Sequence, residues 1–169
     1  MRAMILSNCV WRDVKKTEKA TLAMPKLNFS RTVPYKPDQM LALVSDMKSY
    51  PKFVPNCSAM EIKPSERAPD RICDVRMRMD FGPVSQAYTS RVTIDREHRK
   101  VSVKAINGLF SYMETLWSFT PLKQGTRVDF KIDFEIANPL LRAVLNPAFA
   151  ARQGEIIDAF MIEAKRRYG

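Results

Sequence analysis

A strict alternation of apolar and polar residues over positions 73–81, in the segment RICDVRMRMDF at positions 71–81, constrains the fold of this chain more than any other feature. Successive side chains of a β-strand point to opposite faces of a sheet, so a period of two predicts a strand with one dry and one wet face. Antiparallel sheets that are covered on one side only have this pattern. We therefore expect a one-sided antiparallel sheet whose dry face is covered by another apolar element.

The same period continues from position 58 to position 136, interrupted by short segments of turn-forming residues. These segments are 68–70, 82–83, 96–99, 107–108 and 123–125. Because the connections are short, successive strands are expected to pair as a meander. With six strands here and one more over Lys26–Val33, the pattern predicts a seven-stranded antiparallel sheet.

Two other segments have helical spacing. Residues 37–46 predict a short helix, and residues 140–164 predict a long C-terminal helix with weak points at Pro147 and Gly154. Burying one face of the sheet and one stripe of the long helix is most economical if the sheet curves around that helix. The predicted fold class is therefore α+β, with a curved seven-stranded antiparallel sheet around a long C-terminal helix.

Length and charge limit the function classes. The chain has 169 residues, which fits one domain, and a net charge of +10. Such a charge suits an anionic partner, either membrane headgroups or nucleic acid, or is simply solvated. The aromatic residues are expected on the inner face, which argues against a stacking platform for single-stranded nucleic acid. Three cysteines without a CxxC spacing and a single histidine offer no metal site.

Residues 1–23 are basic and lie outside the periodic part of the sequence. They permit three interpretations: a disordered arm, a transit peptide, or a segment that precedes a true start at Met24. Their short apolar run does not reach the length of a signal peptide. We favour a weakly ordered basic N-terminal extension over 1–23, followed by one folded domain over 24–169.

The inner face of the predicted sheet is rich in large apolar residues, among them Met77, Met113 and Trp117. A straight helix does not fit a curved sheet along its whole length, so the space between them is filled by side chains or left as a cavity. Methionine occurs both as core filler and as lining of permissive pockets. Alternation alone leaves a packed core and a ligand pocket equally open.

A short apolar segment with proline on both sides of an aromatic residue follows the first helix. It contains Tyr50, Pro51, Phe53, Val54 and Pro55. The prolines stiffen the segment and limit it to a short helical turn. It is either a gate at one end of a cavity or a plug that packs into the core.

Few residues suit catalysis. His98 lies in a charged turn, and the sequence has no GxSxG motif or glycine-rich phosphate loop. Glu114 lies one step off the apolar register of its strand, where it is either an exposed residue or a polar anchor at the mouth of a cavity. We predict no enzymatic activity, no catalytic residue, no metal and no catalytic cofactor.

Several tracts of the chain resemble the coenzyme Q-binding proteins of the START/polyketide cyclase superfamily. The most specific are YPKFVP at positions 50–55 and LFSYMETLWSFTP at positions 109–121, and the resemblance covers about 25–169. It implies a helix-grip (START/Bet v 1-like) fold with a hydrophobic tunnel between the sheet and the C-terminal helix. It also implies non-catalytic binding of ubiquinone, a polyprenyl quinone, by a carrier or chaperone for respiratory electron transport or quinone biosynthesis.

The residues that we predict to line this tunnel lie on the inner rows of the strands and on the C-terminal helix. They are Val75, Met77, Met79, Phe81, Tyr88, Met113, Trp117, Phe119, Val128, Phe130, Phe134, Phe149, Ile156 and Phe160. Such a protein is expected at the cytoplasmic surface of a bacterial inner membrane, in peripheral contact with anionic lipid. The alternative location is the matrix side of the mitochondrial inner membrane.

The ribosome-association toxins resemble the chain in the same opening motif, PYxxxQMxxLVxDxxxYPxFxP, at positions 34–55. Their resemblance implies an alternative function, binding to the large ribosomal subunit. The tracts AYTSRV at 87–92 and METLWSF at 113–119 are closer to the quinone-binding members. Ubiquinone is therefore the favoured partner, and the ribosome remains the alternative.

Overall fold

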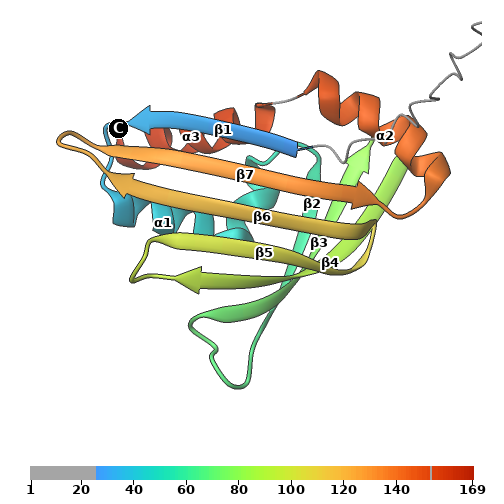
Figure 1. Ribbon diagram of the computed structural model, residues 1–169, viewed down its shortest axis with the longest axis horizontal. Coiled ribbons are helices and arrows are strands. Elements are labelled where there is room, and N and C mark those ends of the chain that lie inside the picture. The colour runs from blue at the N-terminus through green and yellow to red at the C-terminus, as the bar shows by residue number, and fades with distance from the viewer. Residues whose placement is uncertain (1–25, 153) are drawn as a thin grey trace, which may run out of the picture.

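The computed structural model describes residues 26–152 and 154–169, which form one curved antiparallel sheet and a set of helices on its concave side (Figure 1). The predicted extension over 1–23 lies outside the described residues. The elements follow the order β1 (Lys26–Val33), α1 (Pro37–Ser45), η1 (Met47–Lys52), β2 (Cys57–Pro64), β3 (Ile72–Phe81), β4 (Val84–Asp95), β5 (Lys100–Gly108), β6 (Phe110–Pro121), β7 (Thr126–Ile136), α2 (Pro139–Ala151) and α3 (Glu155–Tyr168).

The seven strands are arranged in the order β1-β7-β6-β5-β4-β3-β2. All pairs are antiparallel, and β2 to β7 form the predicted meander. Only β1 leaves the sequential order, because it pairs with β7 from Lys26↔Asp133 to Val33↔Thr126. The predicted α+β fold with a seven-stranded sheet is confirmed.

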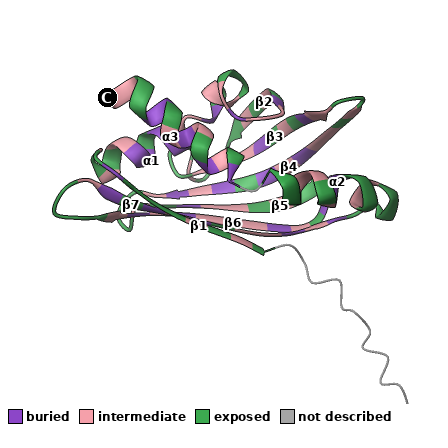
Figure 2. Ribbon diagram, turned by 90° about the horizontal axis from the view of Figure 1, so that it is seen from above, coloured by how far each residue is buried: buried purple, intermediate pink, exposed green. Residues whose placement is uncertain are grey.

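The curvature of the sheet positions the core. In Figure 2, β2, β3 and β4 rise away from the plane of β5, β6 and β7, and α1 and α3 lie in the space between these two parts. The inward row of β4, which consists of Tyr88, Ser90, Val92 and Ile94, is buried, as the alternation predicts. The outward residues Asp74 and Arg91 instead form an ion pair across β3 and β4 (2.8 Å).

The C-terminal helix is divided in two. Pro147 lies inside α2 without ending it, whereas α2 ends at Ala151 and α3 begins at Glu155. Gly154 precedes α3 with a φ of 91°, a conformation that residues with a side chain rarely adopt. The prediction of one unbroken C-terminal helix was therefore wrong in detail. Of the two predicted weak points, Gly154 lies between α2 and α3, whereas Pro147 lies within α2.

Replacing Gly154 by alanine should lower the free energy of unfolding by about 1–2 kcal/mol, because a Cβ atom is disfavoured at positive φ. Space is not the reason, since the added Cβ would have Phe29 Cε1 as its neighbour at 3.6 Å. Urea denaturation measures the effect, and Gly154→Asn, which tolerates positive φ better, is the control. A Gly154→Ala protein at least as stable as the parent would mean that α2 and α3 can join into one helix.

Candidate functional site: an apolar cavity between the sheet and α3

A cavity of about 130 Å³ lies between the concave face of the sheet, η1 and α3. Almost all of its wall is apolar. It is lined by Val44, Met47, Tyr50, Val54, Met60, Val75, Met77, Met79, Tyr88, Ser90, Val92, Val101, Val103, Phe110, Met113, Thr115, Trp117, Phe130, Ile132, Phe149, Ile156 and Phe160. Such a wall selects an apolar ligand, because a charged group would be desolvated there without a partner.

Four polar side chains interrupt the apolar wall: those of Ser90, Thr115, Tyr88 and Tyr50. The Tyr50 hydroxyl donates a hydrogen bond to the backbone oxygen of Val44, so it is occupied. The Tyr88 hydroxyl instead donates to Met77 Sδ at 3.1 Å, and a thioether sulfur is a weak acceptor. The Tyr88 hydroxyl can therefore exchange this partner for a ligand oxygen. The hydroxyl-bearing residues Ser90 and Thr115 belong to the same wall.

The ionisable groups near the cavity are arranged to stay neutral. Burial raises the pKa of Tyr50 and of Tyr88 above the ordinary value for tyrosine. Burial also raises the pKa of the Cys57 thiol to about 11 and raises that of Cys73. A thiol that stays protonated is a poor nucleophile, and both cysteines belong to the hydrophobic core.

His98 does not contribute to the cavity. It lies on the turn after β4, where its Nδ1 contacts Asp95 Oδ2 at 2.8 Å and its side chain is exposed. Among residues 26–152 and 154–169, no three His, Cys, Asp or Glu side chains gather as a metal ion would require. His98 therefore lies outside the described wall of the cavity.

The predicted gate segment closes one side of the cavity. Tyr50 and Val54 line the wall, while Tyr50 and Phe53 pack against each other and each makes a T-shaped contact with Phe160. Ring centroids lie 5.2 Å apart for Tyr50 and Phe160 and 5.1 Å apart for Phe53 and Phe160. Pro51 lies inside η1. The segment packs onto the core and borders the cavity, so both interpretations of it stand.

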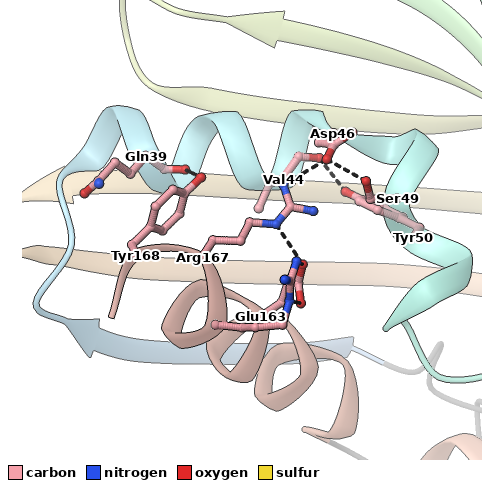
Figure 3. Close-up of polar contacts among 9 residues, drawn as sticks. Gln39, Val44, Asp46, Ser49, Tyr50, Glu163, Arg167 and Tyr168 are labelled. Atoms are coloured by element: carbon pink, nitrogen blue, oxygen red, sulfur yellow. Dashed lines mark hydrogen bonds and ion pairs between the residues drawn. The ribbon is translucent and has the colours of Figure 1, made fainter.

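A polar cluster fastens α3 to the segment beside the gate (Figure 3). Arg167 donates to Glu163 Oε1 at 2.7 Å and to Asp46 Oδ2 at 2.8 Å, so it joins α3 to the end of α1. The Ser49 hydroxyl donates to the same Asp46 oxygen at 2.7 Å. Nearby, the Tyr168 hydroxyl donates to the backbone oxygen of Gln39 at 3.1 Å. These contacts hold η1, and hence Tyr50, against α3.

The predicted tunnel-lining residues fall into three groups. Those in the cavity wall are Val75, Met77, Met79, Tyr88, Met113, Trp117, Phe130, Phe149, Ile156 and Phe160. Phe81 lies in an adjoining groove. The structure places Phe119, Val128 and Phe134 in the packed core instead. Contact of a ligand with any of these residues remains a prediction.

The positions of Phe119, Val128 and Phe134 along their strands explain why these residues lie in the packed core. Phe119 and Val128 are cross-strand partners near the β6–β7 turn, and α1 covers this end of the sheet. Phe134 is enclosed by the rings of Phe110 and Phe149, with centroids 5.5 Å and 5.3 Å away. The period of two shows which face a residue occupies but not whether its neighbours fill the space above it.

Sequence reasoning also missed part of the wall. Ser90, Val103 and Thr115 belong to inward rows that the alternation identified, but their small size drew no attention. Val44 and Met47 come from α1 and η1, whose approach to the sheet is a tertiary feature. The small size of these inward residues was the signal that could have predicted part of the cavity wall, because a small side chain leaves space that its large neighbours do not fill.

Glu114 is not at the cavity. It lies on the opposite face of the sheet, where its Oε1 is 2.8 Å from Lys104 Nζ and its side chain is 46% exposed. Hydrogen bonds from Lys104 and then from Tyr112 lower the pKa of this carboxyl. The polar-anchor interpretation is therefore wrong, because the neighbouring residue Thr115 occupies the inward position.

A groove of about 290 Å³ adjoins the cavity and shares Met79, Phe149 and Ile156 with it. It lies between the segment after η1, the β3–β4 turn and the junction of α2 with α3. Its other lining residues are Pro55, Asn56, Phe81, Gly82, Val144, Leu145, Ala148, Arg152 and Glu155. The groove is the candidate mouth of the cavity.

Comparison with known proteins agrees with this geometry. Residues 33–161 match the family described as polyketide cyclase / dehydrase and lipid transport. Ribosome association toxin RatA of Rickettsia prowazekii is 35% identical over 144 residues, which cover 82% of this chain and 97% of the toxin. Coenzyme Q-binding protein coq10, mitochondrial, of Schizosaccharomyces pombe is 28% identical over 141 residues, which cover 82% of this chain and 86% of that protein.

Among solved structures, the Zhui aromatase/cyclase from Streptomyces sp. R1128 superposes with a TM-score of 0.74 at 18% identity, and the match covers 86% of this chain and 96% of the enzyme. At this identity the likeness shows the helix-grip fold alone.

Lowering the pH should weaken the polar cluster. Hydrogen bonds from Arg166 and then Arg167 hold the pKa of Glu163 at about 2, below its usual 4.5. A lowered carboxyl pKa contributes stability that is present above pH 4.5 and is lost as the pH falls towards 2. Glu163→Gln should therefore lower the free energy of unfolding by about 1–3 kcal/mol at pH 7, and less in acid.

Urea denaturation at a series of pH values measures this difference. Glu155→Gln is the matched control on the same helix, because its carboxylate is exposed and lies 3.9 Å from Arg152. A Glu163→Gln effect as large in acid as at neutral pH would contradict the assignment of this ion-pair cluster.

A family match over most of the chain, relatives that are similar along nearly their whole length, and a helix-grip fold with an apolar cavity lead to one conclusion: the chain belongs to the polyketide cyclase / dehydrase and lipid transport family.

Proposed function

We propose that this protein binds ubiquinone without catalysis, with the quinone ring in the cavity and the polyprenyl tail leaving through the groove. The observation that carries the proposal is an apolar wall with a few neutral hydroxyl groups, those of Ser90, Thr115 and Tyr88. A quinone ring is apolar on its faces and has carbonyl oxygens that accept hydrogen bonds. A relative named as a coenzyme Q-binding protein supports the same ligand.

The size of the site fits a division between ring and tail. A cavity of about 130 Å³ is small beside typical ligand sites of about 300–1,000 Å³. The groove of about 290 Å³ shares its wall with the cavity and extends the site towards the surface. A long isoprenoid chain therefore lies partly in the groove and displaces the flexible side chain of Met79, which lines both spaces.

The proposal assigns the protein a role as carrier or chaperone. The described groups near the cavity lack an activated nucleophile and a tuned base, which acid–base or covalent catalysis requires. Polyprenyl quinones reside in bilayers, so the folded domain over 24–169 acts at a membrane surface. A bacterial inner membrane, met from the cytoplasm, is the favoured place and the matrix side of a mitochondrial inner membrane the alternative.

Filling the cavity should abolish quinone retention. Val103 lines the wall, so Val103→Trp places an indole where the ring would lie. The neighbouring Ser102 faces outward, and Ser102→Trp is the matched control. After expression in quinone-producing cells, lipid extraction and mass spectrometry should find ubiquinone with the parent and the control but not with Val103→Trp.

Circular dichroism and urea denaturation establish that the Val103→Trp protein is folded, since overpacking costs about 1–3 kcal/mol. Retention of quinone by the folded variant would show that the ligand lies elsewhere. No quinone on the parent protein, combined with co-sedimentation with the large ribosomal subunit in sucrose gradients, would replace the proposal by ribosome binding. The relatives named as ribosome association toxins support that second candidate, together with the net charge of +10.

The hydroxyl groups should distinguish a quinone from a plain isoprenoid. Ser90→Ala and Thr115→Val each remove one donor, and each should weaken ubiquinone binding about 2- to 10-fold, the equivalent of about 0.5–1.5 kcal/mol. Binding of squalene, an isoprenoid without oxygen, should not change. Fluorescence quenching of Trp117, which lies in the wall, measures both ligands. Equal losses for ubiquinone and squalene would mean that the hydroxyl groups shape the cavity but do not bind the ring.

A further inference from the structure

The helix α2 is apolar on two opposite faces, but protein covers only one of them. Leu141, Leu145 and Phe149 pack against the core. On the other face, the side chains of Leu140 and Val144 are 80% and 59% exposed. A surface helix normally has its apolar side towards the core and polar residues on the opposite side, so the exposed apolar face of α2 departs from the usual pattern.

The rest of the outward face of α2 is also apolar. Ala143, Pro147 and Ala151 are exposed, and together with Leu140 and Val144 they recur at intervals of three and four residues along one side of the helix. We call these five residues the α2 outer face. Isolated exposed apolar residues need no explanation, but a continuous apolar stripe marks an interaction surface.

Charge indicates which partner covers the α2 outer face. No acidic residue occurs from position 137 to position 153, whereas this stretch contains Arg142 and Arg152. The neighbouring acids are paired, because Glu135 lies 3.0 Å from Arg142 and Glu155 lies 3.9 Å from Arg152. With a net charge of +10, the protein is attracted to an anionic lipid surface, while two copies of it repel each other.

The position of α2 connects this face to the ligand site. Val144 and Ala148 form one wall of the groove, and Phe149 lines the cavity itself. In Figure 2, α2 lies across one end of the sheet, separated along the molecule from α1. An apolar molecule that leaves a bilayer beside α2 therefore meets the groove without crossing water.

We propose that the α2 outer face inserts into the headgroup region of an anionic bilayer and thereby places the groove at the membrane surface. This inference rests on the proposed binding of a membrane-resident ligand. Asn138 caps the start of the helix by accepting hydrogen bonds from the backbone N–H groups of Leu140 (2.8 Å) and Leu141 (3.3 Å). The helix is thus formed before contact with lipid, so binding carries no folding cost for it.

Vesicle co-sedimentation tests the proposal with the full chain. Vesicles of equal parts phosphatidylcholine and phosphatidylglycerol should bind the parent protein, and vesicles of phosphatidylcholine alone should bind it less. The double variant Leu140→Glu/Ala143→Glu, whose two positions are exposed and lie outside the groove, should bind the mixed vesicles about tenfold or more weakly, because the α2 outer face then carries two charges that lipid cannot accommodate. Ile162→Glu is the matched control, since Ile162 is 71% exposed on α3.

A second readout reports insertion directly. Leu140→Trp places a fluorophore on the α2 outer face, and its emission should shift to shorter wavelength when mixed vesicles are added. Ile162→Trp should show no shift. Equal binding by the parent and the double variant, or an equal loss with Ile162→Glu, would overturn the proposal. Light scattering offers a further check. If the parent protein is a dimer and the double variant is a monomer, a second copy of the chain covers the α2 outer face and the proposal is overturned.

The two proposals fail in different ways. If the double variant loses vesicle binding yet still takes up ubiquinone from detergent solution, both stand. If the parent binds mixed vesicles through α2 but takes up no quinone, the proposed role of the α2 outer face stands and the proposed ligand is wrong. If the parent takes up quinone but the double variant binds vesicles as well as the parent does, the proposed ligand stands and the proposed role of the α2 outer face is overturned.

Discussion

The packing of Phe160 joins the three parts of this fold. Its ring, 1% exposed, lies 4.8 Å from the ring of Trp117 on the sheet and 5.2 Å and 5.1 Å from the rings of Tyr50 and Phe53 beside α1. A one-sided sheet has to cover its dry face, and α3 does so at this point. The space that remains around this contact becomes the cavity.

The cavity, the groove and α2 form a continuous path because α2 and α3 are separate helices. An unbroken helix would direct α2 along the axis of α3, whereas the break at Gly154 lets α2 lie across one end of the sheet. There its inner face completes the wall of the site and its outer face remains exposed. The break at Gly154 thus explains both the position of the groove and the exposed apolar face of α2 beside it.

Much of the fold could be predicted from the sequence because it depends on local periodicity. The alternation in β3 and the helical spacing in α1 identified their elements, and β1 has the predicted bounds Lys26–Val33. The break in the C-terminal helix was harder, because Pro147 is the stronger helix breaker in general and yet is accommodated within α2. The positive φ of Gly154 is a property of how both helices dock.

The sequence by itself determined that one face of the sheet is dry and that a second apolar element must cover it. Only the tertiary structure decided which dry residues border a cavity. Val103 and Thr115 line it, while Val128 is fully enclosed, although all three share one face. The physical reason is that alternation records the direction of a side chain, whereas a cavity depends on how far the opposing helices stand from the sheet at each position.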